Sequence, residues 1–173
     1  PPHLRSWRDG WRHLRFLLVY SPRWLFFYPG LLLTSAGLAG MLWLLPGPRT
    51  VFDVTLDIHT MLYAAAAVVL GLQSMSFAAF SKVFGVGVRI LPKDDRVANA
   101  LRVFTLERGL VLGFFLILLG LAGSFHAVTA WGAASFGPIS PGSMMRIAIP
   151  SLTALTAGVQ IVFGSFFLSL LGL

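Results

Sequence analysis

The apolar residues of this chain gather in four long runs. Each run holds about 20 or more residues, the length that an α-helix needs to cross the hydrocarbon core of a bilayer. No Asp, Glu or Arg stands inside any of them. The pattern therefore predicts four membrane-spanning helices. Their expected bounds are about 24–45, 58–84, 109–130 and 147–172.

A different pattern precedes the first run. At helical spacing, two tryptophans and two leucines share one stripe, and three arginines share the neighbouring face. The apolar members are Trp7, Trp11, Leu14 and Leu18, and the basic members are Arg8, Arg12 and Arg15. A cationic amphipathic helix of this kind lies in the membrane interface. Residues 1–23 are therefore expected to form a juxtamembrane arm.

The loop between the second and third runs carries a second amphipathic pattern. Asp94 and Asp95 follow Pro92 and can cap the first turn of a helix, which we favour over a metal-binding role. Apolar residues then recur at helical spacing; they are Val97, Leu101 and Phe104. This pattern predicts a second interfacial helix.

Composition supports a lipid environment. The chain is 57% hydrophobic and 11% charged, whereas soluble domains carry about 25% charged residues. A small domain leaves much of its surface exposed, so lipid must replace water around much of this chain. The predicted fold is an all-α membrane protein, with four transmembrane helices in residues 24–173 and two interfacial helices. The absence of cysteine excludes disulfides and thiolate metal sites.

The formal net charge of +7 raises the question of nucleic-acid binding. The basic residues flank the apolar runs, however, and the positive-inside rule explains both features with one cause. The arm and the loop between the second and third runs hold all but two of the 13 basic residues; the exceptions are Arg49 and Arg146. We therefore expect a multi-pass protein with both termini in the cytoplasm, and no nucleic-acid partner.

Polar groups near the runs have structural explanations. Gln73 and Gln160 stand near the middle of the second and fourth runs, where a hydrogen bond between them would join two helices. Contact with a substrate is the alternative role. Asp53, Asp57 and His59 lie close together in the loop after the first run, but no second ligand cluster completes a metal site. Asp57 is better explained as the cap of the second span.

Catalytic patterns are missing from this sequence. None of the six acidic residues lies inside an apolar run, and no phosphate-binding glycine loop or Ser-His-Asp signature is present. We therefore assign no catalytic residue and no metal ligand. Glu107 and Arg108 open the third run, where they form either a local ion pair or a phosphate-positioning pair.

Four stretches of the sequence carry a family resemblance. The string "WRDGWRHLRFLLVYSPRWLFFYPGLLL" resembles the segment that follows the catalytic domain in bacterial family 2 glycosyltransferases of the dolichol-phosphate- or polyprenyl-phosphate-mannose-synthase-like kind. The other three stretches resemble the later spans of that family; they are "FDVTLDIHTMLYAAAAVVLGLQ", "FTLERGLVLGFFLILLGL" and "IPSLTALTAGVQIVFGSFFLSLLGL".

The resemblance implies the membrane domain of a polyprenyl-phosphate glycosyltransferase-like protein in the bacterial inner membrane. It also implies that the nucleotide sugar and divalent metal belong to a cytosolic catalytic domain, which would end near "PPHLRSWRDGW" and is absent from this chain. The expected partners are membrane lipids, among them polyprenyl phosphate, and that catalytic domain or other membrane subunits. A non-catalytic assembly subunit of a larger membrane complex is the alternative function.

The basic residues supply the candidate binding site. We expect five arginines to line a cytoplasmic rim that binds a lipid phosphate or headgroup, although topology signals or contacts to a cytosolic domain are alternative roles. They are Arg8, Arg12, Arg15, Arg102 and Arg108.

Overall fold

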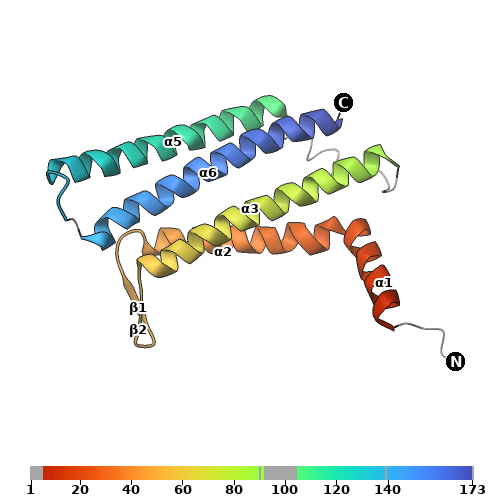
Figure 1. The fold of residues 1–173 in the computed structure, drawn as a ribbon, viewed down its shortest axis with the longest axis horizontal. Helices are drawn as coiled ribbons and strands as arrows, with labels where there is room; N and C mark the ends of the chain where they lie inside the picture. The colour runs from red at the N-terminus through yellow and green to blue at the C-terminus, as the bar shows by residue number, and fades with distance from the viewer. Residues whose placement is uncertain (1–5, 90, 92–104, 139, 173) are drawn as a thin grey trace.

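The computed structural model describes residues 6–89, 91, 105–138 and 140–172 (Figure 1). Within these ranges, four helical segments are long and apolar enough to span a membrane, which confirms the four predicted spans. The first is continuous through a π-helical turn, Arg23–Phe27, and α2, Tyr28–Leu44. The other three are α3, Ile58–Gly87, α5, Leu106–Ala133, and α6, Pro141–Gly172. Each of the last three extends past its predicted bounds.

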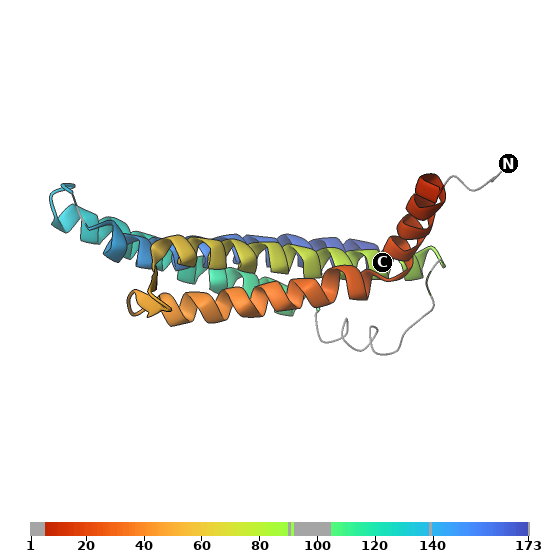
Figure 2. The ribbon, with the colours of Figure 1, turned by 90° about the horizontal axis from the view of Figure 1, so that it is seen from below.

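The four spans form two antiparallel pairs, α2 with α3 and α5 with α6, and the pairs meet where α3 packs against α6 (Figure 1). Both chain termini lie at one end of the bundle, which we name the terminal end. The opposite end, with the turns joining α2 to α3 and α5 to α6, is the hairpin end. Seen from the side, α2 lies on one side of the layer formed by α3 and α6, and α5 slants from that side at the terminal end to the level of the layer at the hairpin end (Figure 2).

Residues Ser6–Tyr20 form the helix α1, which leaves the terminal end at an angle to the bundle (Figures 1 and 2). The predicted arm is thus helical over most of its length. The second predicted interfacial helix, with Asp94 and Asp95, lies outside the described residues.

Irregular backbone precedes α2. The Tyr28 N–H donates to the Arg23 carbonyl, five residues back, as in a π-helix. Pro29 follows and has no N–H to continue the regular ladder. The first span therefore reaches Pro29 through a π-helical turn.

Pro150 does not occupy the first turn of the fourth span. Because α6 begins at Pro141, Pro150 lies inside the helix. Proline removes one backbone donor there. The Ser151 and Thr153 hydroxyls lie close by and donate to the carbonyls of Ile147 and Ile149, at 2.6 and 2.7 Å. Hydroxyl groups of this kind help a membrane helix to tolerate proline.

A short β-hairpin joins α2 to α3, where the sequence suggested only a loop. Strand β1, Arg49–Val51, pairs antiparallel with β2, Val54–Leu56. The two turn residues, Phe52 and Asp53, have φ of 47° and 62°. Both angles are typical of a type I′ turn, which usually takes Asn or Gly. The hairpin runs outward across the hairpin end rather than along the helices (Figure 1).

Close backbone contact holds each helix pair together. A Cβ on Gly71 of α3 would lie 2.5 Å from the Gly30 carbonyl of α2, and one on Gly158 of α6 would lie 2.6 Å from the Gly113 carbonyl of α5. Gly109 and Gly113 of α5 are also buried, whereas Ala36 of α2 is exposed.

An arginine joins the two helix pairs at the hairpin end. Arg146 of α6 donates to the Leu44 carbonyl of α2 at 2.6 Å and forms an ion pair with Asp57, which precedes α3. Asp57 stands at the predicted cap position, but its carboxylate makes this ion pair instead of a capping hydrogen bond. Leu44 and Met61 are fully buried in the adjoining core.

We predict that Gly158→Ala lowers the free energy of unfolding by about 1–3 kcal/mol, because the added methyl group overpacks the contact with α5. Gly142→Ala, in the same helix, is the matched control, since nothing lies within 4 Å of its Cβ position. The control should be neutral or stabilising, as alanine favours helix. Both values can be measured by denaturation in mixed micelles. Equal loss in the two variants would contradict close packing at Gly158.

We predict that Arg146→Gln destabilises the bundle by about 1–3 kcal/mol, because the Asp57 carboxylate and the Leu44 carbonyl lose their charged donor. Asp57→Asn should also destabilise, and the double variant should cost less than the sum of the two single variants. The same micelle denaturation measures this double-mutant cycle. Additive effects would show that the two side chains do not act together.

Candidate functional site

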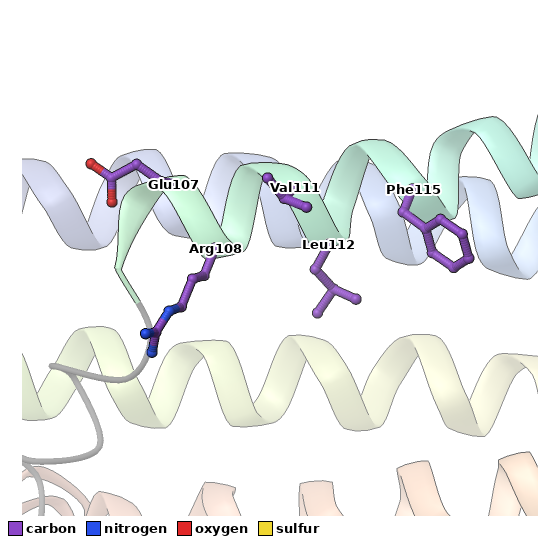
Figure 3. Close-up of a pocket in the computed structure, with 5 residues that line it drawn as sticks. All are labelled: Glu107, Arg108, Val111, Leu112 and Phe115. Atoms are coloured by element: carbon purple, nitrogen blue, oxygen red, sulfur yellow. The ribbon is translucent and has the colours of Figure 1, made fainter.

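The candidate site begins where α5 starts at the terminal end. Thr105 is the N-cap, and its hydroxyl oxygen accepts a hydrogen bond from the Arg108 N–H at 3.4 Å. This cap fixes the first helical turn and therefore the directions of Glu107 and Arg108. Figure 3 shows Arg108 pointing toward the α3 side and Glu107 pointing away from it.

A shallow depression of about 420 Å³ follows this turn along α5 (Figure 3). Its lining residues recur at helical spacing, so they form one stripe. They are Glu107, Arg108, Val111, Leu112 and Phe115. The charged residues stand at the membrane-edge end of the stripe, and the three apolar residues extend toward the middle of the span.

This arrangement suits an amphiphile. The guanidinium of Arg108 can bind a phosphate through two parallel hydrogen bonds. The exposed side chains of Val111, Leu112 and Phe115 offer a hydrocarbon surface directly beside it. The sequence identified Arg108 but not the apolar wall. Leu112 and Phe115 lie four and seven residues after Arg108, so helical spacing would have identified them as neighbours of Arg108 on one face.

The second half of the chain, residues 79–172, matches the family model described as the glycosyltransferase family 2 C-terminal transmembrane region. The chain belongs to this family. It is also 35% identical to the low-salt glycan biosynthesis hexosyltransferase Agl6 of Haloferax volcanii. That alignment covers 98% of this chain and 40% of the relative, so the chain spans less than half of the relative's length. No solved structure matches the chain.

The arm of this glycosyltransferase transmembrane region carries two more of the predicted arginines, Arg8 and Arg12, both exposed on α1. Trp7, Trp11 and Leu14 are exposed beside them and, with Gly10, line a smaller depression of about 180 Å³. Three apolar side chains of α1 therefore lie exposed next to Arg8 and Arg12.

Two members of the predicted arginine set have no described side chain. Arg15 belongs to α1, but its side chain lies outside the described part of the structure, and so does the whole of Arg102. The described structure thus brings only Arg108 to the depression on α5. A rim shared by all five arginines stays a prediction.

The two glutamines of the transmembrane region do not form the expected hydrogen bond. Gln73 is exposed on α3. The Gln160 side-chain oxygen is buried and has no hydrogen-bond partner. Sequence position gives the depth of a residue in the membrane but not the direction of its side chain.

Among the described residues, no group of three or more His, Cys, Asp or Glu side chains could hold a metal ion. In the loop that was considered for a metal site, Asp57 is engaged by Arg146, and Asp53 is exposed at the tip of the β-hairpin. The Asp57 carboxylate therefore joins two helices instead of binding a metal.

Proposed function

We propose that this transmembrane region anchors a family 2 glycosyltransferase and presents a polyprenyl-phosphate acceptor at its terminal end. The observation that carries the proposal is the depression on α5, where Arg108 stands directly above an apolar wall. In this arrangement the lipid phosphate lies against Arg108, and the first isoprenoid units lie along Leu112 and Phe115.

The proposal assigns the transfer reaction to a different part of the enzyme. A catalytic domain next to the terminal end would hold the nucleotide sugar and any divalent metal. Holding the acceptor phosphate at a fixed depth would position it for the catalytic domain. This would reduce the translational and rotational entropy lost when the two reactants come together. The relative Agl6, whose printed name is that of a hexosyltransferase, supports sugar transfer as the reaction class.

Charge supports a cytoplasmic position for the terminal end. Most of the described cations lie there; they are Arg8, Arg12, Arg23, Lys82, Arg89 and Arg108. The hairpin end has Arg49 and Arg146, and Arg146 is neutralised by Asp57. By the positive-inside rule the terminal end faces the cytoplasm. The proposed location is the cytoplasmic membrane, the inner membrane if the source is bacterial.

The arm has a supporting part in this proposal. The Trp7 side chain is 86% exposed, which is costly for an indole in water but favourable at the headgroup level of a bilayer. With its apolar stripe in the acyl boundary, α1 would direct Arg8 and Arg12 to anionic headgroups. It would thereby hold the junction to the catalytic domain close to the membrane surface.

We predict that Arg108→Gln reduces photo-crosslinking of a photoreactive polyprenyl phosphate to the membrane-embedded protein by about 10-fold or more, because a charge-assisted hydrogen bond is lost. Arg49→Gln, an exposed arginine at the hairpin end, is the matched control and should label normally. A photoreactive polyprenol without phosphate should label both proteins equally weakly. Equal labelling of the two variants by the phosphate probe would refute the acceptor site.

We predict that the terminal end faces the cytoplasm, and single-cysteine variants can test this orientation. The chain has no cysteine of its own, so each variant carries one reactive thiol in this region. A membrane-impermeant maleimide added to intact cells should label Phe52→Cys, whose side chain is 96% exposed at the hairpin end. It should label Arg89→Cys, exposed at the terminal end, only after the membrane is opened. The reverse result would place the terminal end outside.

A further inference from the structure

One face of the α3 and α6 layer is left largely uncovered by the rest of the described structure. On the opposite side lie α2 and the start of α5, whereas α1 projects on the uncovered side, at the terminal end (Figure 2). We name the uncovered surface the α3/α6 face. We assign to it the large exposed side chains that recur at helical spacing, Tyr63, Leu70, Phe77 and Phe84 of α3 and Leu152, Phe163, Phe166 and Leu170 of α6. The Phe77 ring also makes an edge contact with Phe26 of the first span, at 4.7 Å between ring centroids. By composition alone, lipid chains could cover such a face.

Gln73 is the exception to this apolar surface. It lies at the middle of α3 and is exposed between Leu70, three residues before it, and Phe77, four residues after it. Its carboxamide makes no hydrogen bond within the described part of the chain. A carboxamide facing hydrocarbon without a partner is unfavourable, and lipid chains offer no partner. Whatever covers this face must therefore bring a polar group to the middle of the membrane.

The nearest amide within the chain does not supply that group. Gly164 of α6 lies beside Ser76 and Phe80 of α3, so Gln160, one turn earlier in the parallel helix α6, is level with Gln73. The Gln160 oxygen is nevertheless buried in the bundle without a hydrogen bond. The two carboxamides share a depth, but no hydrogen bond joins them.

We infer that a second copy of this chain covers the α3/α6 face, related to the first by a two-fold axis along the membrane normal close to Gln73. A carboxamide has both a donor and an acceptor, so it complements its own copy across such an axis. Gln73 donates to the oxygen of the partner's Gln73 and accepts from its amide. No lipid and no purely apolar helix can satisfy the group in this way.

The spacing along α3 fits this pairing. The exposed positions Tyr63, Ala66, Leu70, Gln73 and Phe77 alternate steps of three and four, the repeat by which two helices pack side by side at a shallow angle. Ala66 is small enough to allow close approach. The depression on α5 belongs to a helix on the other side of the layer, so the pairing does not depend on the proposed acceptor site.

Cysteine cross-linking in native membranes tests the inference. In the full-length protein without other cysteines, Leu70→Cys, Gln73→Cys and Phe77→Cys should each give a disulfide-linked dimer on mild oxidation, because a disulfide requires Cα atoms within about 7 Å. Leu118→Cys, exposed on α5, is the matched control and should stay monomeric. Absence of dimers at all three α3 positions, or equal cross-linking at Leu118→Cys, would overturn the inference.

A second measurement tests the role of the carboxamide itself. Gln73→Leu should weaken dimerisation in detergent or bilayers about tenfold, because two interhelical hydrogen bonds are lost. Gln160→Leu should leave the dimer unchanged. If Gln160→Leu weakens the dimer as much as Gln73→Leu, or if neither variant changes it, the pairing of the two copies through Gln73 is wrong.

Discussion

Inside a bilayer no water is available to satisfy the backbone, and burying apolar surface against another helix gains little over burying it in lipid. Helices in this setting associate through close van der Waals contact, and this requires small residues where the backbones approach. Gly71 against Gly30 and Gly158 against Gly113 provide that contact in the two helix pairs. The packing of α3 on α6, and with it the positions of all polar side chains in the spans, depends on these two pairs being formed.

The same constraint explains where charge is found. Charged side chains are expensive in hydrocarbon, so the described ones lie at the two ends of the bundle. At the hairpin end Arg146 is used internally, since it binds Leu44 and Asp57 and so ties α6 to the α2–α3 pair. At the terminal end Arg108 is exposed at the edge of an apolar wall. One end of the bundle therefore uses its arginine to join the helix pairs, and the other has an exposed arginine beside an apolar surface.

Hydrophobic runs were sufficient to predict the spans, because a run of that length has no other stable place in a protein of this composition. Predictions failed where direction or local geometry mattered. Phe52 and Asp53 adopt a turn that favours Asn and Gly, so no turn signal was visible. The fourth span begins before its predicted bound of 147, because α6 extends back to Pro141 through residues of low hydropathy. Asp57 was correctly placed at the start of a span, but its partner, 89 residues away, could not be read from local sequence.

The candidate site was predictable only in part for the same reason. Arg108 could be predicted as a site residue because it directly precedes an apolar run. The apolar surface of Leu112 and Phe115 could not, because it depends on which side of α5 is not covered by α6. Because α6 is the main packing partner of α5, most of α5 faces lipid, and a hydrocarbon chain can lie against it without displacing another helix. The α3/α6 face differs, since a polar group stands at its centre and a lipid chain cannot satisfy it. In the two proposals the lipid and the second copy therefore use different helices, the lipid lying along the start of α5 and the second copy lying against α3 and α6.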